Sequence, residues 1–384
     1  MERKEKKKEM DIGKKTMAAG NGNLEEEQPY AYWLAQIKGL GGKTRKELVE
    51  YAGSPKLVYG MKRAELKGLL PEKKIDSLVK AQMEGNPVEQ YEKLRKREID
   101  FIPVYHPLYP AKLKNIEDAP FGIYTEGSLP EEARPSVAVI GARECSEYGR
   151  YMAQVCGKQL AEAGINVISG MARGIDGISQ NAALKAGGLS YSVLGCGTNV
   201  CYPAENRNIY IAVKKCGGII SEYPPDTQPS PRLFPLRNRI ISGLSDLVLI
   251  IEARNRSGTL ITADLALEQG KEVYVVPGRV TDALSEGCNR LLKQGAGIMT
   301  SVQEMLEETG LLEMAEQRES AERKEEGEED NKLLDALDFY PKSIDTLIQE
   351  TGLEYRRLVC EMMKLCMEGK AQQISAGQFV RKSK

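Results

Sequence analysis

Two arginines, Arg237 and Arg239, stand just before an apolar run with helical spacing, within the stretch FPLRNRIISGLS (residues 234–245). That spacing predicts a helix with both arginines in its first turn. A first turn exposes unpaired N–H groups and carries partial positive charge, so cations are unfavourable there without a nearby anion. The pair therefore predicts an anion such as phosphate. Residues 237 and 239 do not share a helix face, so one arginine could bind phosphate while the other braces a loop.

Four other loops combine small residues with cations or hydroxyl groups. The loop GARECSEYG (141–149) offers backbone N–H groups and a guanidinium to one phosphate, although it lacks the three-glycine spacing of dinucleotide sites. The loop SGMARGIDGIS (169–179) repeats this combination. The glycines of LGCGTNVCYPAENRN (194–208) permit close approach of a ligand, or form only a tight turn. The segment SGT (257–259) begins a predicted helix and forms a small anion nest.

These five loops are expected at one edge of a sheet, and together they favour a row of phosphates, which a nucleic-acid backbone supplies. Each arginine could instead pair with a carboxylate. Phe234 could stack on a base or pack in the core, and Asp176 could cap a helix, pair with an arginine or act in catalysis. The predicted phosphate- and DNA-binding residues are Gly141, Arg143, Ser169, Gly170, Arg173, Gly174, Phe234, Arg237, Asn238, Arg239, Ser257, Gly258 and Thr259.

Several enzyme classes lack their signatures here. No G-x-x-x-x-G-K-[ST] motif signals a P-loop ATPase. The single histidine, His106, argues against a histidine-based zinc site and a Ser-His-Asp triad. Asp176, Glu222 and Glu252 could form a carboxylate acid–base site, but nothing in their spacing requires one. We therefore predict no catalytic residue, no metal site and no cofactor.

The charge distribution is compatible with a polyanionic partner. The chain of 384 residues has a net charge of −1, but residues 304–330 contain twelve acidic and three basic side chains. The charges of residues 1–27 cancel, so the remaining parts have a net charge of +8.

Eight cysteines without a C-x-x-C pair are typical of reduced thiols in a cytoplasmic protein. No apolar run approaches membrane-spanning length, and no secretory signal is recognised at the N-terminus.

The order of elements predicts an α/β fold. Short β-branched runs such as SVAVIGA (136–142), INVISG (165–170) and DLVLIIEA (246–253) alternate with amphipathic stretches of helical length. This alternation predicts a Rossmann-like, doubly wound, mostly parallel sheet with helices on both faces. The predicted parts are a disordered tail (1–27), a helical module (28–95), the extended Rossmann-like domain (96–304), an acidic linker (305–330) and a winged-helix-like domain (331–384).

Motifs along most of the chain resemble the DprA/Smf family of DNA-processing proteins. They include GARECSEYG, VISGMARGID, FPLRNRIISGLS and SGTLITA, and the resemblance extends over about residues 30–380. It implies a phosphate pocket at Gly141, Ala142 and Arg143, and an Arg-Asn-Arg element at residues 237–239. The turn GLGGKT (39–44) is similar to that of a helix-hairpin-helix, which agrees with an N-terminal SAM-like or helix-hairpin-helix-like module that contacts either DNA or protein.

The resemblance also implies partners. DprA-like proteins bind single-stranded DNA, protect incoming DNA in natural transformation, and help load RecA onto strands covered by single-strand binding protein. They form homodimers, and no enzymatic turnover is expected. The sequence departs from the family at Ala142, where serine or threonine is usual, and at Gln180, where histidine is usual. The segment just before Phe234 often carries a basic residue in the family; here Arg232 of PSPRL is only an imperfect substitute for it. The DNA affinity could therefore differ from that of relatives.

Part of the sequence is also compatible with an alternative function. A nucleotide-processing enzyme of the phosphoribohydrolase or lysine-decarboxylase-like group would use a Gly-Gly-x-Gly-Thr-x-x-Glu signature. The chain keeps Gly258 and Thr259 but has no glutamate at the later position and lacks the paired glycines. For the C-terminal part, both DNA binding and protein docking stay open.

Overall fold

The computed structural model describes residues 24–375 and 377–382, apart from the side chains of 322–332, 356 and 357. The chain forms two compact units that divide between Leu312 and Glu313. Most of the predicted disordered tail lies outside the described residues. Its last four residues, 24–27, are instead the first turn of a helix.

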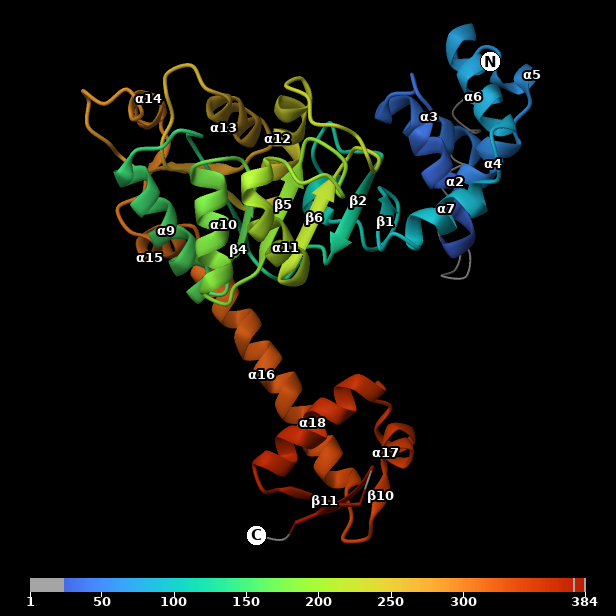
Figure 1. Cartoon of the computed structure of the whole chain (residues 1–384), viewed down its shortest axis with the longest axis vertical. Helices are drawn as coiled ribbons and strands as arrows, with labels where there is room; N and C mark the ends of the chain where they lie inside the picture. The colour runs from blue at the N-terminus through green and yellow to red at the C-terminus, as the bar shows by residue number, and fades with distance from the viewer. Residues whose placement is uncertain (1–23, 376, 383–384) are drawn as a thin grey trace, which may run out of the picture. The chain divides into compact units, whose positions relative to one another are not determined.

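The described part of the N-terminal region is helical (Figure 1). Its helices are α2 (Leu24–Gln36), α3 (Gly42–Ala52), α4 (Pro55–Gly60), α5 (Arg63–Leu66), α6 (Glu72–Met83) and α7 (Pro87–Arg95). Two of them begin as their sequences predict, because Ser54 and Asn86 accept N-cap hydrogen bonds and each is followed by proline. The buried Trp33 packs in a core that also includes Phe101 and Tyr124 of the adjoining sheet.

A nine-stranded sheet forms the centre of the first unit. Its strands are β1 (Asp100–Pro103), β2 (Gly122–Gly127), β3 (Ser136–Ile140), β4 (Asn166–Ser169), β5 (Ser190–Leu194), β6 (Gly217–Ser221), β7 (Leu247–Ile250), β8 (Glu272–Val275) and β9 (Gly297–Ile298). Their spatial order is β1-β2-β6-β5-β4-β3-β7-β8-β9. The strands from β6 to β9 in this order are parallel, with Ile140 of β3 opposite Ile250 of β7, whereas β1 and β2 are antiparallel additions. The predicted mostly parallel sheet is confirmed.

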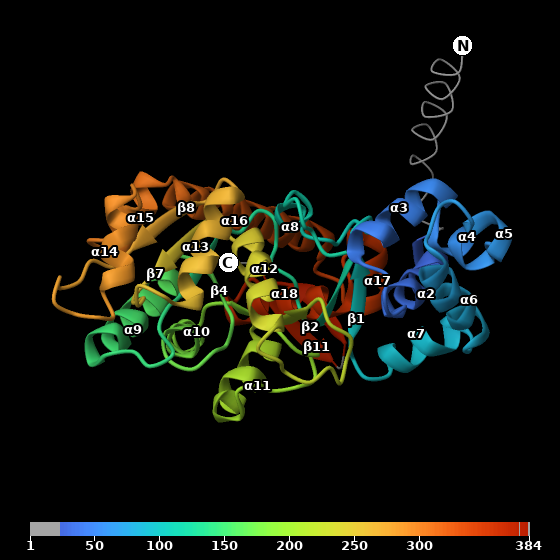
Figure 2. The same ribbon diagram turned by 90° about the horizontal axis from the view of Figure 1, so that it is seen from above.

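Helices cover both faces of this sheet. On one face, side chains of α8 (Ala111–Lys114), α12 (Leu233–Leu244) and α13 (Gly258–Glu268) share a buried core with the strands. Along the other lie α9 (Glu147–Glu162), α10 (Ile175–Lys185), the short 3-10 turn η2 (Ala204–Asn206) and α11 (Arg207–Lys215), with α9, α10 and α11 side by side (Figures 1 and 2). The unit continues through α14 (Glu286–Lys293) and α15 (Val302–Glu308).

Chain order reverses between β3 and β7. The chain runs from β3 through β4 and β5 to β6, then returns past its start to β7 and β8. In open parallel sheets, ligands bind beyond the carboxyl ends of the strands at such a reversal, because the loops on either side diverge and leave a crevice. A ligand-binding site is therefore expected at the loops that follow β3 and β7.

The second unit is small and has its own hydrophobic core. Its elements are the C-terminal part of α16 (Leu311–Ala336), β10 (Lys342–Ser343), α17 (Ile344–Thr351), α18 (Tyr355–Met367), β11 (Ala371–Ser375) and β12 (Gln378–Arg381). The strands form an antiparallel sheet in the order β10-β12-β11, over a core that includes Leu347, Leu358 and Phe379. The segment predicted as an acidic linker is mostly helical, within α15 and α16, because glutamate, lysine and alanine favour helix.

Within the described part of the chain, none of the helices combines the length and the apolar character that crossing a membrane requires.

Candidate nucleic-acid interface

An open groove of about 610 Å³ lies at the predicted place, beyond the carboxyl ends of β3 and β7. The loops after these two strands supply part of its lining, and the start of α12 supplies much of the rest. The groove brings together eight of the predicted residues: Gly141, Arg143, Phe234, Arg237, Asn238, Ser257, Gly258 and Thr259. These eight residues lie together because loops that follow parallel strands converge at one edge of the sheet.

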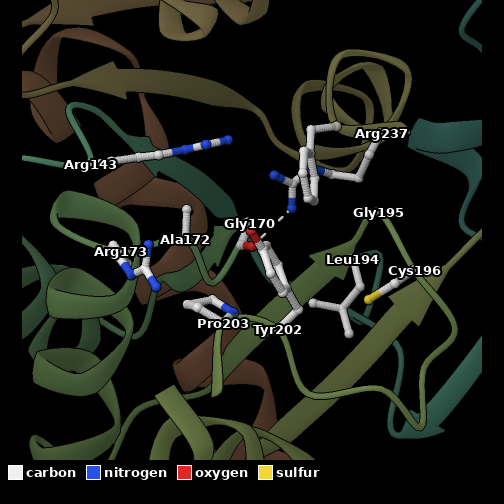
Figure 3. A pocket seen from close by; sticks show the side chains of 11 residues that line it. Arg143, Gly170, Ala172, Arg173, Leu194, Gly195, Cys196, Tyr202, Pro203 and Arg237 are labelled. Carbon is white, nitrogen blue, oxygen red and sulfur yellow. Dashed lines mark hydrogen bonds between the residues drawn. The ribbon is translucent and has the colours of Figure 1, made fainter. Parts of the chain in front are cut away.

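Arg143 is the exposed cation at the centre of this region. Its guanidinium carbon lies 5.5 Å from the centre of the Phe234 ring, in cation–π geometry. It borders both the groove and a neighbouring pocket, where Figure 3 shows Arg143 and Arg173 on one side and Arg237 with Leu194 and Cys196 on the other. No carboxylate within the described residues forms an ion pair with Arg143, so its donors are available to a ligand.

An aromatic pair forms one wall of the groove. The rings of Tyr202 and Phe234 stack with their centres 5.5 Å apart and their planes 18° apart. Gly195 lies against them, because a Cβ there would come within 2.8 Å of the Phe234 ring. Phe234 is half-buried and lines the groove, so of its two predicted roles the placement favours contact with a ligand. Tyr202 was not predicted, although an aromatic residue before proline in a glycine-rich loop was a visible signal.

The start of α13 forms the other wall. Ser257 is the N-cap residue of this eleven-residue helix, and its hydroxyl oxygen has no hydrogen-bond partner within the described residues. Gly258 and Thr259 follow in the first turn, and the exposed Arg254 lies three residues before Ser257. Exposed N–H groups at a helix start and a nearby guanidinium suit a phosphate. The predicted anion nest is therefore part of the groove.

Arg237 is buried and acts within the protein. It is 5% exposed, and its Nη1 donates to the carbonyl oxygens of Gly170, at 2.9 Å, and of Val193. Its Nε donates to Oδ1 of Asn238 at 3.2 Å. The prediction that it lies in the first turn is wrong, because α12 begins at Leu233 and Arg237 is its fifth residue. Through these hydrogen bonds Arg237 joins α12 to the carboxyl-terminal ends of β4 and β5.

The anion that accompanies Arg237 is Asp176 of α10, which is 6% exposed. The Asp176 carboxylate accepts a hydrogen bond from the Gly170 N–H at 3.2 Å, while the Gly170 carbonyl accepts from Arg237. Burial raises the pKa of Asp176, and the positive charge of Arg237 opposes this rise; burial likewise lowers the pKa of Arg237, and Asp176 opposes that. No ion pair joins Asp176 to an arginine among the described residues; it accepts the Gly170 N–H and lies within the electrostatic influence of Arg237.

Arg239 lies away from the groove lining and is held by protein groups. Its Nη2 forms a 2.8 Å ion pair with Glu222, and its other nitrogens donate to the carbonyl oxygens of Asp118 and Leu236. It is the seventh residue of α12, so the first-turn prediction is wrong here too. The structure thus does not bring Arg239 to the predicted phosphate site.

Replacement of Arg239 by alanine should therefore lower stability more than DNA affinity. Loss of hydrogen bonds to a half-buried charged group should reduce the free energy of unfolding by about 1–3 kcal/mol. Affinity for an oligo-dT strand should change less than about threefold, because no phosphate contact is removed. Urea denaturation and fluorescence anisotropy measure the two quantities. A stable variant with strongly reduced affinity would instead identify Arg239 as a phosphate ligand.

The remaining predicted residues lie at the end of β4 and in the loop that follows it. Ser169 is fully buried and donates its hydroxyl to the Val139 carbonyl, so it does not face a ligand, and the Gly170 N–H is used by Asp176. Arg173 is exposed but pairs with Glu205 at 2.6 Å. Gly174 has a φ of +71° and no room for a Cβ beside the carbonyl of Ala142. Arg173 and Gly174 border a second cleft beside the groove, which Arg143 also lines.

Glu252 fixes the loop that carries Arg143. It is 2% exposed and accepts hydrogen bonds from the N–H and the hydroxyl of Ser146. Ser146 in turn caps α9 by accepting from the Gly149 N–H at 3.0 Å. The three carboxylates considered for catalysis, Asp176, Glu222 and Glu252, are thus each engaged by protein groups. No cluster of three potential metal ligands occurs among the residues that the structure describes.

Replacement of Gly149 by alanine should disturb this arrangement. The new Cβ would lie 2.3 Å from a carboxylate oxygen of Glu252, which cannot move without releasing Ser146. Such overpacking costs about 1–3 kcal/mol, and the displaced loop should also weaken DNA binding. Gly60→Ala in α4 is the matched control, since nothing lies within 4 Å of its Cβ position. If Gly149→Ala and Gly60→Ala have equal melting temperatures, the packing around Glu252 is looser than described.

The departure from the family pattern at Gln180 has a structural explanation. Gln180 is fully buried, and its amide nitrogen donates to the hydroxyls of Ser190 and Ser192 and to the Tyr191 carbonyl. Its amide oxygen accepts from the Met171 N–H at 3.1 Å. Gln180 therefore joins α10 to β5 inside the protein and does not line the groove.

Comparison with known proteins agrees with these features. A family model described as DNA recombination-mediator protein A matches residues 100–310. Protein Smf of Escherichia coli is 42% identical over 207 residues, which cover 54% of this chain and 55% of that protein, so the match spans about half of this relative.

Two solved structures are also similar. The X-ray structure of DNA processing protein A from Streptococcus pneumoniae has a TM-score of 0.65 and 31% identity, covering 73% of this chain and 97% of the other. A structure of DNA processing protein A from Helicobacter pylori, described as giving insight into its single-stranded DNA binding mode, has a TM-score of 0.50 and 28% identity, over 55% and 94% of the two chains. The family model covers more than half of the chain, and these relatives agree with it. The chain therefore belongs to the DprA/Smf family of DNA recombination-mediator proteins.

Proposed function

We propose that this protein binds single-stranded DNA in the groove beyond β3 and β7 and acts as a recombination mediator. The observation that carries the proposal is the position of Arg143, an exposed guanidinium without an ion-pair partner in the described chain, between an aromatic wall and a helix start. Cations, free N–H groups and aromatic rings in one groove are the usual elements of single-strand binding. The binding of single-stranded DNA by the Helicobacter pylori relative supports it.

Each wall of the groove has its own part in this proposal. Arg143, Arg254 and the first N–H groups of α13 bind successive phosphates. A base stacks against the Tyr202–Phe234 pair, a contact worth about 1–3 kcal/mol. Arg237 and Asn238 support the groove from below. Because stacking and phosphate contacts do not read base edges, binding should show little sequence preference.

The wider role rests on family membership. We propose that the protein protects incoming single strands and helps load RecA onto strands covered by single-strand binding protein. It acts in the cytoplasm as a homodimer, without cofactor or catalytic turnover. The helical region from α2 to α7 is proposed as a SAM-like or helix-hairpin-helix-like module, and the unit from α17 to β12 as a winged helix. Arg356 and Arg357 are basic residues in the sequence of α18, where a winged helix would present its recognition helix, and their side chains lie outside the described residues.

The test is fluorescence anisotropy of a labelled oligo-dT strand over a series of salt concentrations, beside a duplex of equal length. We expect preferential binding of the single strand, with log affinity falling by about 0.7 for each phosphate contact per unit of log salt concentration. Absence of binding at low salt would overturn the proposal. Release of free base from AMP by the same protein would favour the nucleotide-processing alternative.

A further inference from the structure

An ion pair links the end of the N-terminal helical region to the loop that precedes α12. Arg97 follows α7, and its two terminal nitrogens bind the two carboxylate oxygens of Asp226 at 2.9 and 3.0 Å. This bidentate pair raises the pKa of Arg97 and holds the pKa of Asp226 below its usual range. Asp226 lies in the loop between β6 and α12, which leads directly to Phe234.

Asp226 also bonds to the loop after β5. Asn199 donates its side-chain amide to the Asp226 carboxylate at 2.7 Å and accepts from the Asp226 N–H at 2.8 Å. The Gly197 N–H donates to the Thr227 carbonyl at 2.9 Å. A Cβ at Gly197 would meet the Asp226 nitrogen at 2.8 Å, so the two loops are in close contact.

These two loops carry the aromatic wall. Tyr202 lies three residues after Asn199, and Phe234 lies eight residues after Asp226. The relative position of the loops therefore controls the Tyr202–Phe234 stack. Asp226 has a φ of +66°, in the left-handed region that residues other than glycine adopt uncommonly, although aspartate does so more often than most. Its bonds to Arg97 and Asn199 hold it there, so losing them should let the loop relax.

We propose that Arg97 is a positioning residue for the groove, through which the helical region sets the geometry of the aromatic wall. The inference rests on the proposed function, since it concerns binding at the same site. Arg97 acts through Asp226 and Asn199 and does not itself contact DNA. Because Arg97 and Asp226 are 43% and 66% exposed, a change in the helical region could open or close the pair at small energetic cost.

Replacing Asp226 distinguishes a positioning role of Arg97 from direct binding of phosphate by Arg97. Anisotropy with labelled oligo-dT is measured for Arg97→Ala, Asp226→Ala and the double variant. We expect each single variant to bind oligo-dT three- to tenfold more weakly than the wild type. The double variant should have the same affinity as the single variant with the larger defect, because both residues act through one contact. The salt dependence of binding should stay unchanged. If Arg97 were a phosphate ligand, Asp226→Ala would bind DNA more tightly and Arg97→Ala would have a reduced salt slope. That result would overturn the proposal.

Arg95→Ala is the matched control, because Arg95 lies two residues earlier and pairs with Asp100. It should bind like the wild type. Hydrogen–deuterium exchange without DNA gives an independent measurement. Arg97→Ala should exchange faster in residues 194–203 and 222–234, whereas Arg95→Ala should not. Unchanged exchange and affinity in Arg97→Ala would disprove the positioning role, while failure of the wild type to bind oligo-dT would concern the proposed function alone.

Discussion

Arg143→Ala should weaken binding of single-stranded DNA at least tenfold without changing the melting temperature. The variant loses a charge-assisted contact worth about 1.5–3 kcal/mol, and each 1.4 kcal/mol is a factor of ten in affinity. It should also lose about 0.7 from the salt slope, because one phosphate contact disappears. Stability should persist, since Arg143 is exposed and has no ion pair with any described carboxylate to lose.

Two controls separate this effect from a general loss of positive charge. Arg63→Ala removes an exposed arginine from α5, where it pairs with Glu72 and Asp76, and should leave affinity unchanged. Arg143→Lys keeps the charge but not the planar fork and should recover only part of the affinity. Anisotropy over a salt series measures all three variants. An Arg143→Ala protein with wild-type affinity would remove the central element of the proposed site.

Arg237→Met should strongly destabilise the first unit. The substitution removes hydrogen bonds to two carbonyl oxygens and leaves the buried Asp176 without its positive neighbour. Breaking such a buried arrangement by removing one partner costs about 3–5 kcal/mol. Urea denaturation followed by fluorescence of the single tryptophan measures the change, because Trp33 is buried in the core that joins the helical region to the sheet.

The pH dependence identifies Asp176 as the origin of this loss. The folded-state pKa of Asp176 is raised above the unfolded value of about 3.9, so the folded state binds its proton more strongly. Stability therefore falls as pH rises from about 3.9 through the folded-state pKa, and removing Arg237 should deepen this fall. Adding Asp176→Asn to Arg237→Met should recover part of the lost stability and flatten the pH profile. A double variant as unstable as the sum of the single variants would show that the two residues act independently.

The parallel sheet could be predicted from sequence because its strands are continuous apolar runs. The runs at 136–142, 165–170 and 246–253 correspond to β3, β4 and β7, and their loops converge where predicted. The start of α12 was misplaced because the helix begins before Pro235, whose position in the first turn fits proline's fixed φ and missing N–H. An amphipathic pattern alone does not mark that boundary.

The roles of the two arginines could not be predicted. Arginine is rarely buried, so Arg237 resembled a surface ligand in the sequence. Its partners at Gly170, Asp176 and Val193 lie more than 40 residues away and approach only when β4 and β5 pair. Glu222 lies seventeen residues before Arg239, just after β6, and likewise meets it only in the folded protein. Of the two partners predicted for these arginines, phosphate or carboxylate, Arg239 has a carboxylate, that of Glu222.

The buried amide of Gln180 has a consequence for the conditions under which the protein can work. An imidazole in this position would gain a proton near pH 6.5 and exchange an acceptor for a donor, so the bonds from α10 to β5 would have to rearrange. The Gln180 amide has no such titration, and its contacts with Met171, Ser190 and Ser192 are the same in weakly acidic and weakly alkaline surroundings. The hydrogen bonds of Gln180 that join α10 to β5 therefore do not depend on pH in this range.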